Sequence, residues 1–137
     1  MTEAGKMLEM AKKMAAAAEQ KAIDIDVPSV ITVVDKSGIL VYYERMEDSL
    51  LASVEIAQNK AWTAAALKMP TSDVCDAAKE SGPLFGLGTD CGCRIVTFGG
   101  GFPIFENGKI IGGIGVSGGT VEEDMSVAQA GLAAVGM

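Results

Sequence analysis

The chain has 137 residues, the length of a single domain (residues 1–137), and 49% of them are hydrophobic. Its formal net charge of −7 argues against binding to a nucleic-acid backbone, which requires clustered lysine and arginine. Histidine is absent, which excludes the commonest general base and transition-metal ligand. No stretch has the roughly 18 apolar residues of a membrane span, and the polar-striped N-terminus predicts no signal peptide. We therefore expect a cytoplasmic protein that binds neither nucleic acid nor membrane.

The N-terminal part predicts a helix followed by a β-hairpin. Apolar residues recur every three or four positions over Glu3–Ala22, which is typical of a helix with one buried face. Two apolar runs, Ser29–Val34 and Ile39–Arg45, then flank the turn Asp35–Gly38, in which glycine is free to adopt a positive φ. This pattern predicts two antiparallel strands.

The middle of the chain predicts two helices and an irregular segment. Alanine-rich Ser53–Lys68 has a helical apolar face, and Pro70 ends it. Thr71 then begins a short helix that reaches about Lys79. The glycine-rich stretch from Glu80 to Gly92 predicts no regular structure.

The C-terminal part predicts three more strands. They are Arg94–Phe98, Phe102–Phe105 and Lys109–Val116, and the last two are joined by Asn107-Gly108. An Asn-Gly pair between apolar runs is the strongest short hairpin signal, because a type I′ turn needs positive φ at both positions. The predicted sheet therefore has five strands, and its hairpin connections make it antiparallel.

A glycine turn leads from the last strand into a terminal helix that ends near Val135. Thr120 followed by Glu123 fits a capping box at the start of this helix. Helix N-termini bind anions through their unpaired N–H groups, so this turn is a candidate ligand site. The strands carry few polar residues, so helices must cover both faces of the sheet, which predicts an α/β fold.

Three segments together resemble the GlcG/HbpS-like family. They read SVITVVDKSGILVYYERMEDS, ASVEIAQNKAWTAAALKMPTSD and FGGGFPIFENGKIIGGIGVSGGTVEED. The family includes the C-terminal domain of PduO-type corrinoid adenosyltransferases and small proteins encoded near glycerol and propanediol dehydratases. The resemblance implies a profilin-like three-layer α/β/α fold around a five-stranded antiparallel sheet. It also implies a homo-oligomer and, for some members, binding of haem.

The chain departs from the family pattern in its first hairpin. The family has histidine after the turn glycine, whereas Ile39 follows Gly38 here, and the first helix lacks the histidine of PduO-type domains. A bound haem would therefore need cysteine, methionine or tyrosine as its ligand. The cofactor stays open on the sequence alone.

Four groups of residues are candidates for ligand binding, each with a structural alternative. Gly118, Gly119 and Thr120 offer N–H groups to an anion, or simply begin a helix. Gly99, Gly100 and Gly101 let the backbone approach a ligand, or form a bend. Arg45 orients a ligand or joins a surface ion pair. Lys60 orients an acidic ligand or a carboxylate of a partner subunit, or extends to solvent.

No metal site is expected from the cysteines. Cys75, Cys91 and Cys93 are too few for a structural zinc site when histidine is absent, which favours plain thiols. A shared metal at a subunit interface and redox-active thiols are the alternatives. No catalytic residue is assigned.

Three functions remain. The leading hypothesis is an accessory protein, with little or no catalytic activity, that binds a tetrapyrrole or a small carboxylate or diol metabolite. By the resemblance, it would serve cobalamin-dependent or dehydratase metabolism. The alternatives are an enzyme that uses Lys60 and Arg45 beside the Gly118–Thr120 turn, and a structural module of a larger assembly.

Overall fold

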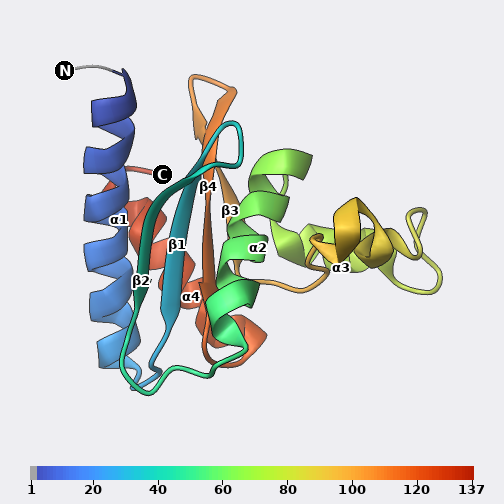
Figure 1. Ribbon diagram of the computed structural model, residues 1–137, viewed down its shortest axis with the longest axis horizontal. Helices are drawn as coiled ribbons and strands as arrows, with labels where there is room; N and C mark the ends of the chain where they lie inside the picture. The colour runs from blue at the N-terminus through green and yellow to red at the C-terminus, as the bar shows by residue number, and fades with distance from the viewer. Residues whose placement is uncertain (1–2) are drawn as a thin grey trace.

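One antiparallel sheet organises the chain, whose residues 3–137 are described by the computed structural model (Figure 1). The strands are β1 (Val30–Asp35), β2 (Leu40–Arg45), β3 (Gly101–Glu106) and β4 (Lys109–Ser117), in the order β2-β1-β4-β3. The helices are α1 (Glu3–Asp24), α2 (Ser53–Leu67), α3 (Thr71–Ala78) and α4 (Val121–Ala134). Among residues 3–137, no helix is both long enough and apolar enough to cross a bilayer.

The helices form layers on the two faces of the sheet. Helices α1 and α4 pack together on one face, and α2 covers the other (Figure 1). Side chains of β1 alternate accordingly: Ile31 and Val33 join the core under α1 and α4, while Val34 packs on Ala61 of α2. The α/β fold and the antiparallel pairing are therefore confirmed.

The prediction of five strands was wrong, because the segment Arg94–Phe98 pairs with no strand. The hydroxyl of Thr63 in α2 accepts a hydrogen bond from the Val96 N–H at 3.0 Å and donates one to the Arg94 carbonyl at 3.3 Å. Ile95 and Val96 are buried, so the apolar run that predicted a strand lies against a helix instead. One side chain thus supplies the partners that a neighbouring strand would provide.

Strand β4 lets α2 approach the sheet closely. A Cβ atom at Gly115 would overlap the Ala57 carbonyl oxygen, and one at Gly113 would overlap the Ala61 carbonyl oxygen. Glycine is required at both positions because the helix backbone occupies the space of a side chain. The small residues of α2 and β4 therefore set the spacing between these layers.

Two local predictions are confirmed at the ends of β4. Asn107 and Gly108 have φ values of 52° and 78°, as a type I′ turn between β3 and β4 requires. Thr120 caps α4: its hydroxyl accepts from the Glu123 N–H, while the Glu123 carboxylate accepts from the Thr120 N–H.

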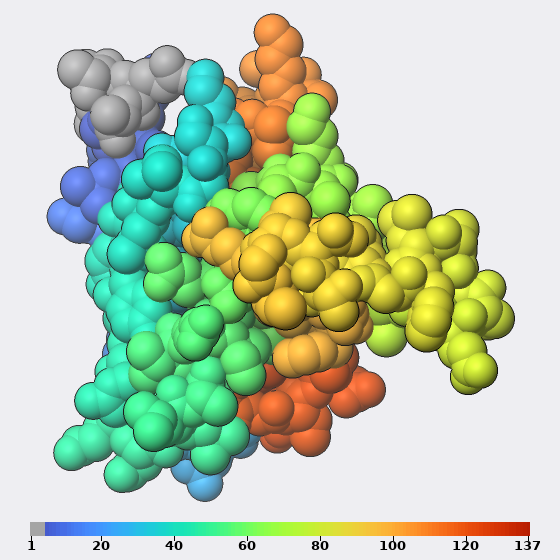
Figure 2. All heavy atoms as spheres, turned by 45° about the vertical axis from the view of Figure 1, so that its right-hand side comes forward, coloured from blue at the N-terminus to red at the C-terminus, as the bar shows by residue number. Residues whose placement is uncertain are grey.

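Residues 79–94 form an arm that extends away from the sheet together with α3 (Figures 1 and 2). The arm contains two short 3-10 turns, Leu87–Thr89 and Cys91–Cys93. Its apolar side chains Leu84 and Phe85 are exposed, Phe85 to 70%. The arm therefore adds surface to the molecule rather than core.

Replacing Thr32 with valine is expected to stabilise the fold by about 1 kcal/mol. Thr32 lies fully buried in β1, and its hydroxyl is the one buried side-chain polar atom without a hydrogen-bond partner among the described residues. Valine keeps the shape and removes the cost of desolvating that hydroxyl. Urea denaturation checks this, and a loss of stability in Thr32→Val would show that the hydroxyl has a partner in solution.

Candidate functional site

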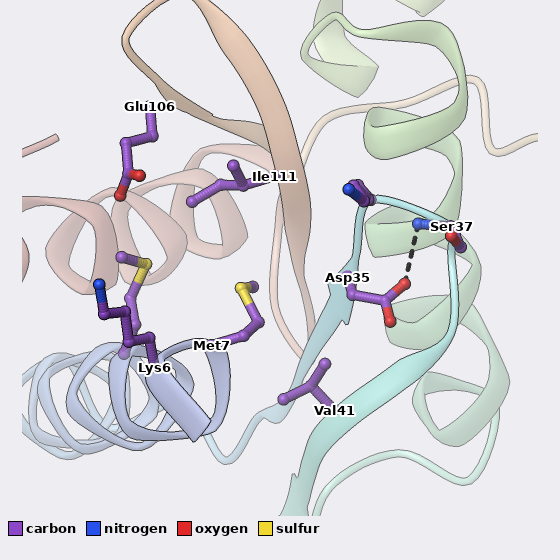
Figure 3. Close-up of a pocket in the computed structure, with 9 residues that line it drawn as sticks. Lys6, Met7, Asp35, Ser37, Val41, Glu106 and Ile111 are labelled. Carbon is purple, nitrogen blue, oxygen red and sulfur yellow. Dashed lines mark hydrogen bonds between the residues drawn. The ribbon is translucent and has the colours of Figure 1, made fainter. Parts of the chain in front are cut away.

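A hollow of about 330 Å³ lies at the end of the sheet where the two hairpins turn (Figure 3). We call it the α1 groove, because the first turns of α1 form one of its walls. Its apolar lining consists of Met7 and Met10 of α1, Val41 of β2 and Ile111 of β4. These side chains are half-buried, so the groove exposes an apolar floor to an entering ligand.

The rim of the groove carries both positively and negatively charged side chains. Lys6 of α1 and Lys36 of the first hairpin turn bring two ammonium groups, while Asp35 and Glu106 bring carboxylates. One oxygen of the Asp35 carboxylate accepts from the N–H groups of Ser37, at 2.8 Å (Figure 3), and of Ile39, at 3.1 Å. Asp35 thereby fixes the hairpin turn.

A second hollow of about 430 Å³ continues the groove toward the end of α4. The two hollows share Lys6, Met10 and Glu106, and the second is also lined by Glu9, Lys13, Ala134 and Val135. The groove is therefore elongated along α1, and Met10 lines both of its halves.

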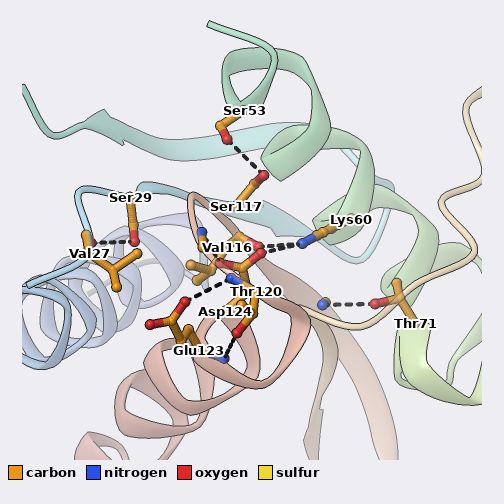
Figure 4. A network of polar contacts seen from close by, with 12 residues as sticks. Val27, Ser29, Ser53, Lys60, Thr71, Val116, Ser117, Thr120, Glu123 and Asp124 are labelled. Atoms are coloured by element: carbon orange, nitrogen blue, oxygen red, sulfur yellow. Dashed lines mark hydrogen bonds and ion pairs between the residues drawn. The ribbon is translucent and has the colours of Figure 1, made fainter. Parts of the chain in front are cut away.

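A second polar feature, a buried ion pair, lies toward the other end of the sheet (Figure 4). Lys60 of α2 lies 2.9 Å from Asp124 of α4, and it also donates to the Val116 carbonyl at 2.8 Å. The two side chains are 0% and 4% exposed, respectively. The ring of Phe98 lies 5.1 Å from the Lys60 ammonium, which adds a cation–π contact.

Burial opposes both charges of this pair. It lowers the pKa of Lys60, an effect that the Asp124 carboxylate counteracts. It likewise raises the pKa of Asp124, while Lys60 and the backbone N–H groups of Gly118 and Gly119 act to lower that pKa. The pair is thus held by mutual attraction and by hydrogen bonds that satisfy both groups.

The predicted site residues at Gly99–Gly101 lie against this ion pair. A Cβ atom at Gly100 would come within 2.5 Å of the Lys60 ammonium, and one at Gly99 would lie 2.8 Å from Val121 of α4. The N–H of Gly101 donates to the Thr71 hydroxyl at 2.9 Å. The glycines let the chain pass between α2 and α4 over Lys60, where any larger residue would overlap the lysine or Val121.

The N–H groups at the start of α4 are used inside the molecule. The Gly119 N–H donates to Asp124 at 2.8 Å, and the Thr120 N–H donates to Glu123 at 2.9 Å (Figure 4). A Cβ atom at Gly118 would overlap the Pro28 carbonyl oxygen. The position that we predicted for an external anion is thus filled by carboxylates of the same helix.

The structure brings together Lys60, the Gly99–Gly101 run and the Gly118–Thr120 turn. Arg45 lies at the same end of the sheet, because Arg45 and Ser117 both pair with Val30. Arg45 is exposed at the end of β2 and forms no ion pair within residues 3–137. The carboxylate that Lys60 meets belongs to its own chain, at Asp124. Sequence analysis missed this partner, because 64 residues separate the two and no local pattern links them.

Sequence analysis also missed the groove. Met7 and Met10 fall on the apolar face of α1, where a methionine stripe is ordinarily core. The one signal was the turn Asp35–Gly38, which had to lie at an end of the sheet, but nothing placed α1 beside it. The cysteines lie elsewhere: Cys75, Cys91 and Cys93 are exposed on α3 and the arm.

Comparison with known proteins gives a consistent result. Residues 7–133 match the family model of the HbpS-like proteins, which is described as "Haem degrading protein HbpS-like". An uncharacterized 15.0 kDa protein from the dhaT-dhaS intergenic region of Citrobacter freundii is 47% identical over 125 residues, which are 91% of this chain and 88% of that protein. The similarity therefore extends over nearly the whole of both chains.

Two further matches involve PduO. The corrinoid adenosyltransferase PduO of Salmonella typhimurium is 43% identical over 119 residues, which are 87% of this chain but 35% of PduO. This chain thus spans about a third of that relative. The crystal structure of a PduOC:heme complex is 40% identical and superimposes with a TM-score of 0.91, covering 93% of each chain.

Proposed function

The chain belongs to the HbpS-like family, and from this premise we propose that it is an accessory protein that binds a tetrapyrrole in the α1 groove. The observation that carries the proposal is the groove itself, which combines an apolar floor with ammonium groups at its rim. A related structure is a haem complex, which supports this ligand class. The dehydratase or cobalamin-linked setting rests on the two bacterial relatives alone.

The shape of the groove suits a flat ligand that is partly exposed. Pockets for small ligands typically enclose about 300–1,000 Å³, and the first hollow alone reaches the lower end of that range. The second hollow extends it along α1, so a ring larger than the first hollow has room to continue. The apolar floor would bury one face or edge of the ring.

The charges at the rim suit the acidic side groups of a tetrapyrrole. Lys6 and Lys36 are both exposed, so their ammonium groups can pair with carboxylates outside the floor. One oxygen of the Asp35 carboxylate is engaged with the backbone N–H groups of Ser37 and Ile39. Glu106 remains a carboxylate on the same rim, so the proposal assigns the acidic groups of the ligand to the two lysines specifically.

The lining of the groove contains no histidine, cysteine or tyrosine, so it supplies no usual ligand for haem iron. In haem proteins a methionine thioether ligates iron beside a histidine, and here Met7 and Met10 belong to the apolar floor. A tetrapyrrole would therefore be held by the floor and the rim rather than through a bound metal. A small carboxylate or diol metabolite is the alternative occupant, and it would need the rim but not the methionines.

We also propose that the chain self-associates in the cytoplasm. Two pairs of adjacent apolar residues are exposed, Leu50 and Leu51 after β2 and Leu84 and Phe85 on the arm, and contiguous exposed apolar surface often marks protein interfaces. The three exposed cysteines suit a reducing compartment. A reaction at Lys60 gains no support, because its side chain is fully buried and paired with Asp124.

Haemin titration of the purified protein is the test, and we expect a saturable, shifted Soret band. The double variant Lys6→Glu/Lys36→Glu should weaken binding about tenfold, because two rim ion pairs are each worth up to about 1 kcal/mol. The control Lys12→Glu/Lys79→Glu makes the same change in net charge at exposed lysines outside the groove. Equal weakening in both variants would show that overall charge, and not the groove, governs binding.

Cobalamin and small carboxylates serve as comparison ligands. A Soret change no greater than that of a non-binding carrier protein would overturn the tetrapyrrole proposal. Saturable binding of a small carboxylate, lost in Lys6→Glu/Lys36→Glu, would then identify the alternative occupant.

A further inference from the structure

We infer that Glu19 of α1 and Glu44 of β2 share one proton and so form a pH-sensitive contact between this helix and the edge strand of the sheet. Loss of the proton leaves two facing carboxylates, whose repulsion loosens α1 from β2. The inference goes beyond the proposed function, because it requires no ligand in the α1 groove. Met10 of α1 and Val41 of β2 both line that groove, so a movement of α1 on β2 reaches it.

The register of the sheet places Glu44 and Tyr42 beneath α1. In the antiparallel pairing of β1 with β2, Glu44 lies opposite Ile31, and Tyr42 lies opposite Val33. Residues that lie opposite each other share a face of the sheet. Ile31 and Val33 belong to the core under α1 and α4, and Tyr42 packs against that core. The half-buried Glu44 therefore lies on the face that α1 covers, on a strand at the edge of the sheet.

Helix α1 brings Glu19 to the same place. Ala15 and Ala22 belong to the buried stripe of α1, and Glu19 lies half-buried between them, one turn from each. The carboxyl groups of Glu19 and Glu44 are hydrogen-bonded to each other, and the Tyr42 hydroxyl donates to Glu44. An ionised carboxylate can only accept, so a hydrogen bond between two carboxyl groups requires that one of them carries a proton.

The immediate neighbours of the pair are uncharged. On α1, the positions one turn before and after Glu19 are Ala15, Ala16, Ala22 and Ile23. On the sheet, the residues that share the face of Glu44 beside it are Ile31, Tyr42 and Met46. Arg45 alternates to the other face, where its charge acts on Tyr43. The titratable groups that act on Glu44 in the described chain are therefore Glu19 and Tyr42, and neither supplies a positive charge.

The proton of the pair is held up to neutral pH. Burial, together with the charge and the hydrogen bond of Glu19, raises the pKa of Glu44 from 4.5 to about 7. The folded chain then binds this proton more tightly than the unfolded chain, so the shared proton stabilises the fold at low pH, and this stabilisation is lost as the pH rises through about 7. Histidine, which ordinarily titrates in this range, is absent from the chain. The carboxyl pair thus gives a protein without histidine a response to pH near neutrality.

NMR titration of the glutamate carboxyl carbons tests the shared proton. In the wild type we expect one carboxyl of the pair to titrate near pH 7. In Glu19→Gln, Glu44 should titrate at least about one pH unit lower, because the neighbouring charge is gone. Glu80→Gln, at an exposed position on the arm, is the matched control and should leave the titration unchanged. Titration of both carboxyls in the ordinary range in the wild type would overturn the inference.

Urea denaturation at pH 6 and at pH 8 tests the effect of the proton on the fold. The folded-to-unfolded ratio of the wild type should fall by up to about tenfold between these values, an upper bound because solvent screens a half-exposed group. Glu44→Gln keeps a hydrogen-bond donor but does not titrate, so most of this fall should disappear, whereas Glu80→Gln should retain it. A fall of equal size in both variants would show that the pair does not govern the response, and circular dichroism establishes that each variant is folded.

Discussion

Replacing Lys60 with methionine is expected to destabilise the fold by about 3–5 kcal/mol, because it leaves the Asp124 carboxylate buried without its counter-charge. The lysine joins α2 to α4 and also satisfies the Val116 carbonyl, so its loss removes three contacts at once. Methionine preserves most of the length of the side chain, so little of the effect comes from an empty cavity. Urea denaturation of the wild type and the variant measures the difference.

The double variant Lys60→Met/Asp124→Leu serves as the control for this experiment. It leaves no buried charge without a partner, so its loss of stability should be smaller than the sum of the losses in the two single variants. Lys12→Met, at an exposed position of the same residue type, should change stability by less than about 0.5 kcal/mol. A Lys60→Met variant as stable as Lys12→Met, or strict additivity in the cycle, would contradict the role assigned to the pair.

Replacing Gly115 with alanine is also expected to have a large effect, lowering the free energy of unfolding by about 3 kcal/mol. The added Cβ atom would overlap the Ala57 carbonyl oxygen and lie 2.5 Å from the Ala61 backbone nitrogen. Both obstacles are backbone atoms of α2, which cannot rotate away as a side chain can. The helix must therefore shift from the sheet, and this shift would also strain Lys60.

Gly108→Ala is the matched control for Gly115→Ala. Its Cβ atom meets nothing within 4 Å, but its φ of 78° still penalises alanine by about 1–2 kcal/mol. Thermal or chemical denaturation should therefore rank Gly115→Ala as the less stable of the two. The reverse order would show that α2 does not rest on the backbone of β4.

Local signals in the sequence were sufficient for most of the fold. The Asn107-Gly108 turn and the Thr120 cap are confirmed because each depends on a few adjacent residues with a strong conformational preference. The predicted strand at Arg94–Phe98 failed because the partner of its backbone is the side chain of Thr63 in α2. A short apolar run has the same sequence pattern whether it forms a strand or packs as an irregular segment against a helix.

The candidate site was less predictable than the fold. The position of Lys60 on the apolar side of its helix left burial and extension to solvent both open, and the structure shows it fully buried, with a partner 64 residues away. Met7 and Met10 carried no sign of bordering a hollow, because a hollow arises only when α1 packs beside the two hairpin turns. Such a feature belongs to the tertiary arrangement and not to any segment of the chain.

The groove and the ion pair lie toward opposite ends of the sheet, and this separation bears on how the protein can evolve. Substitutions around Lys36 and Glu106 change what the groove accepts without touching the contacts of Lys60 and Asp124. Ligand preference can therefore diverge among descendants of this chain while each keeps enough stability to fold. A scaffold divided in this way can acquire new specificities one exposed residue at a time.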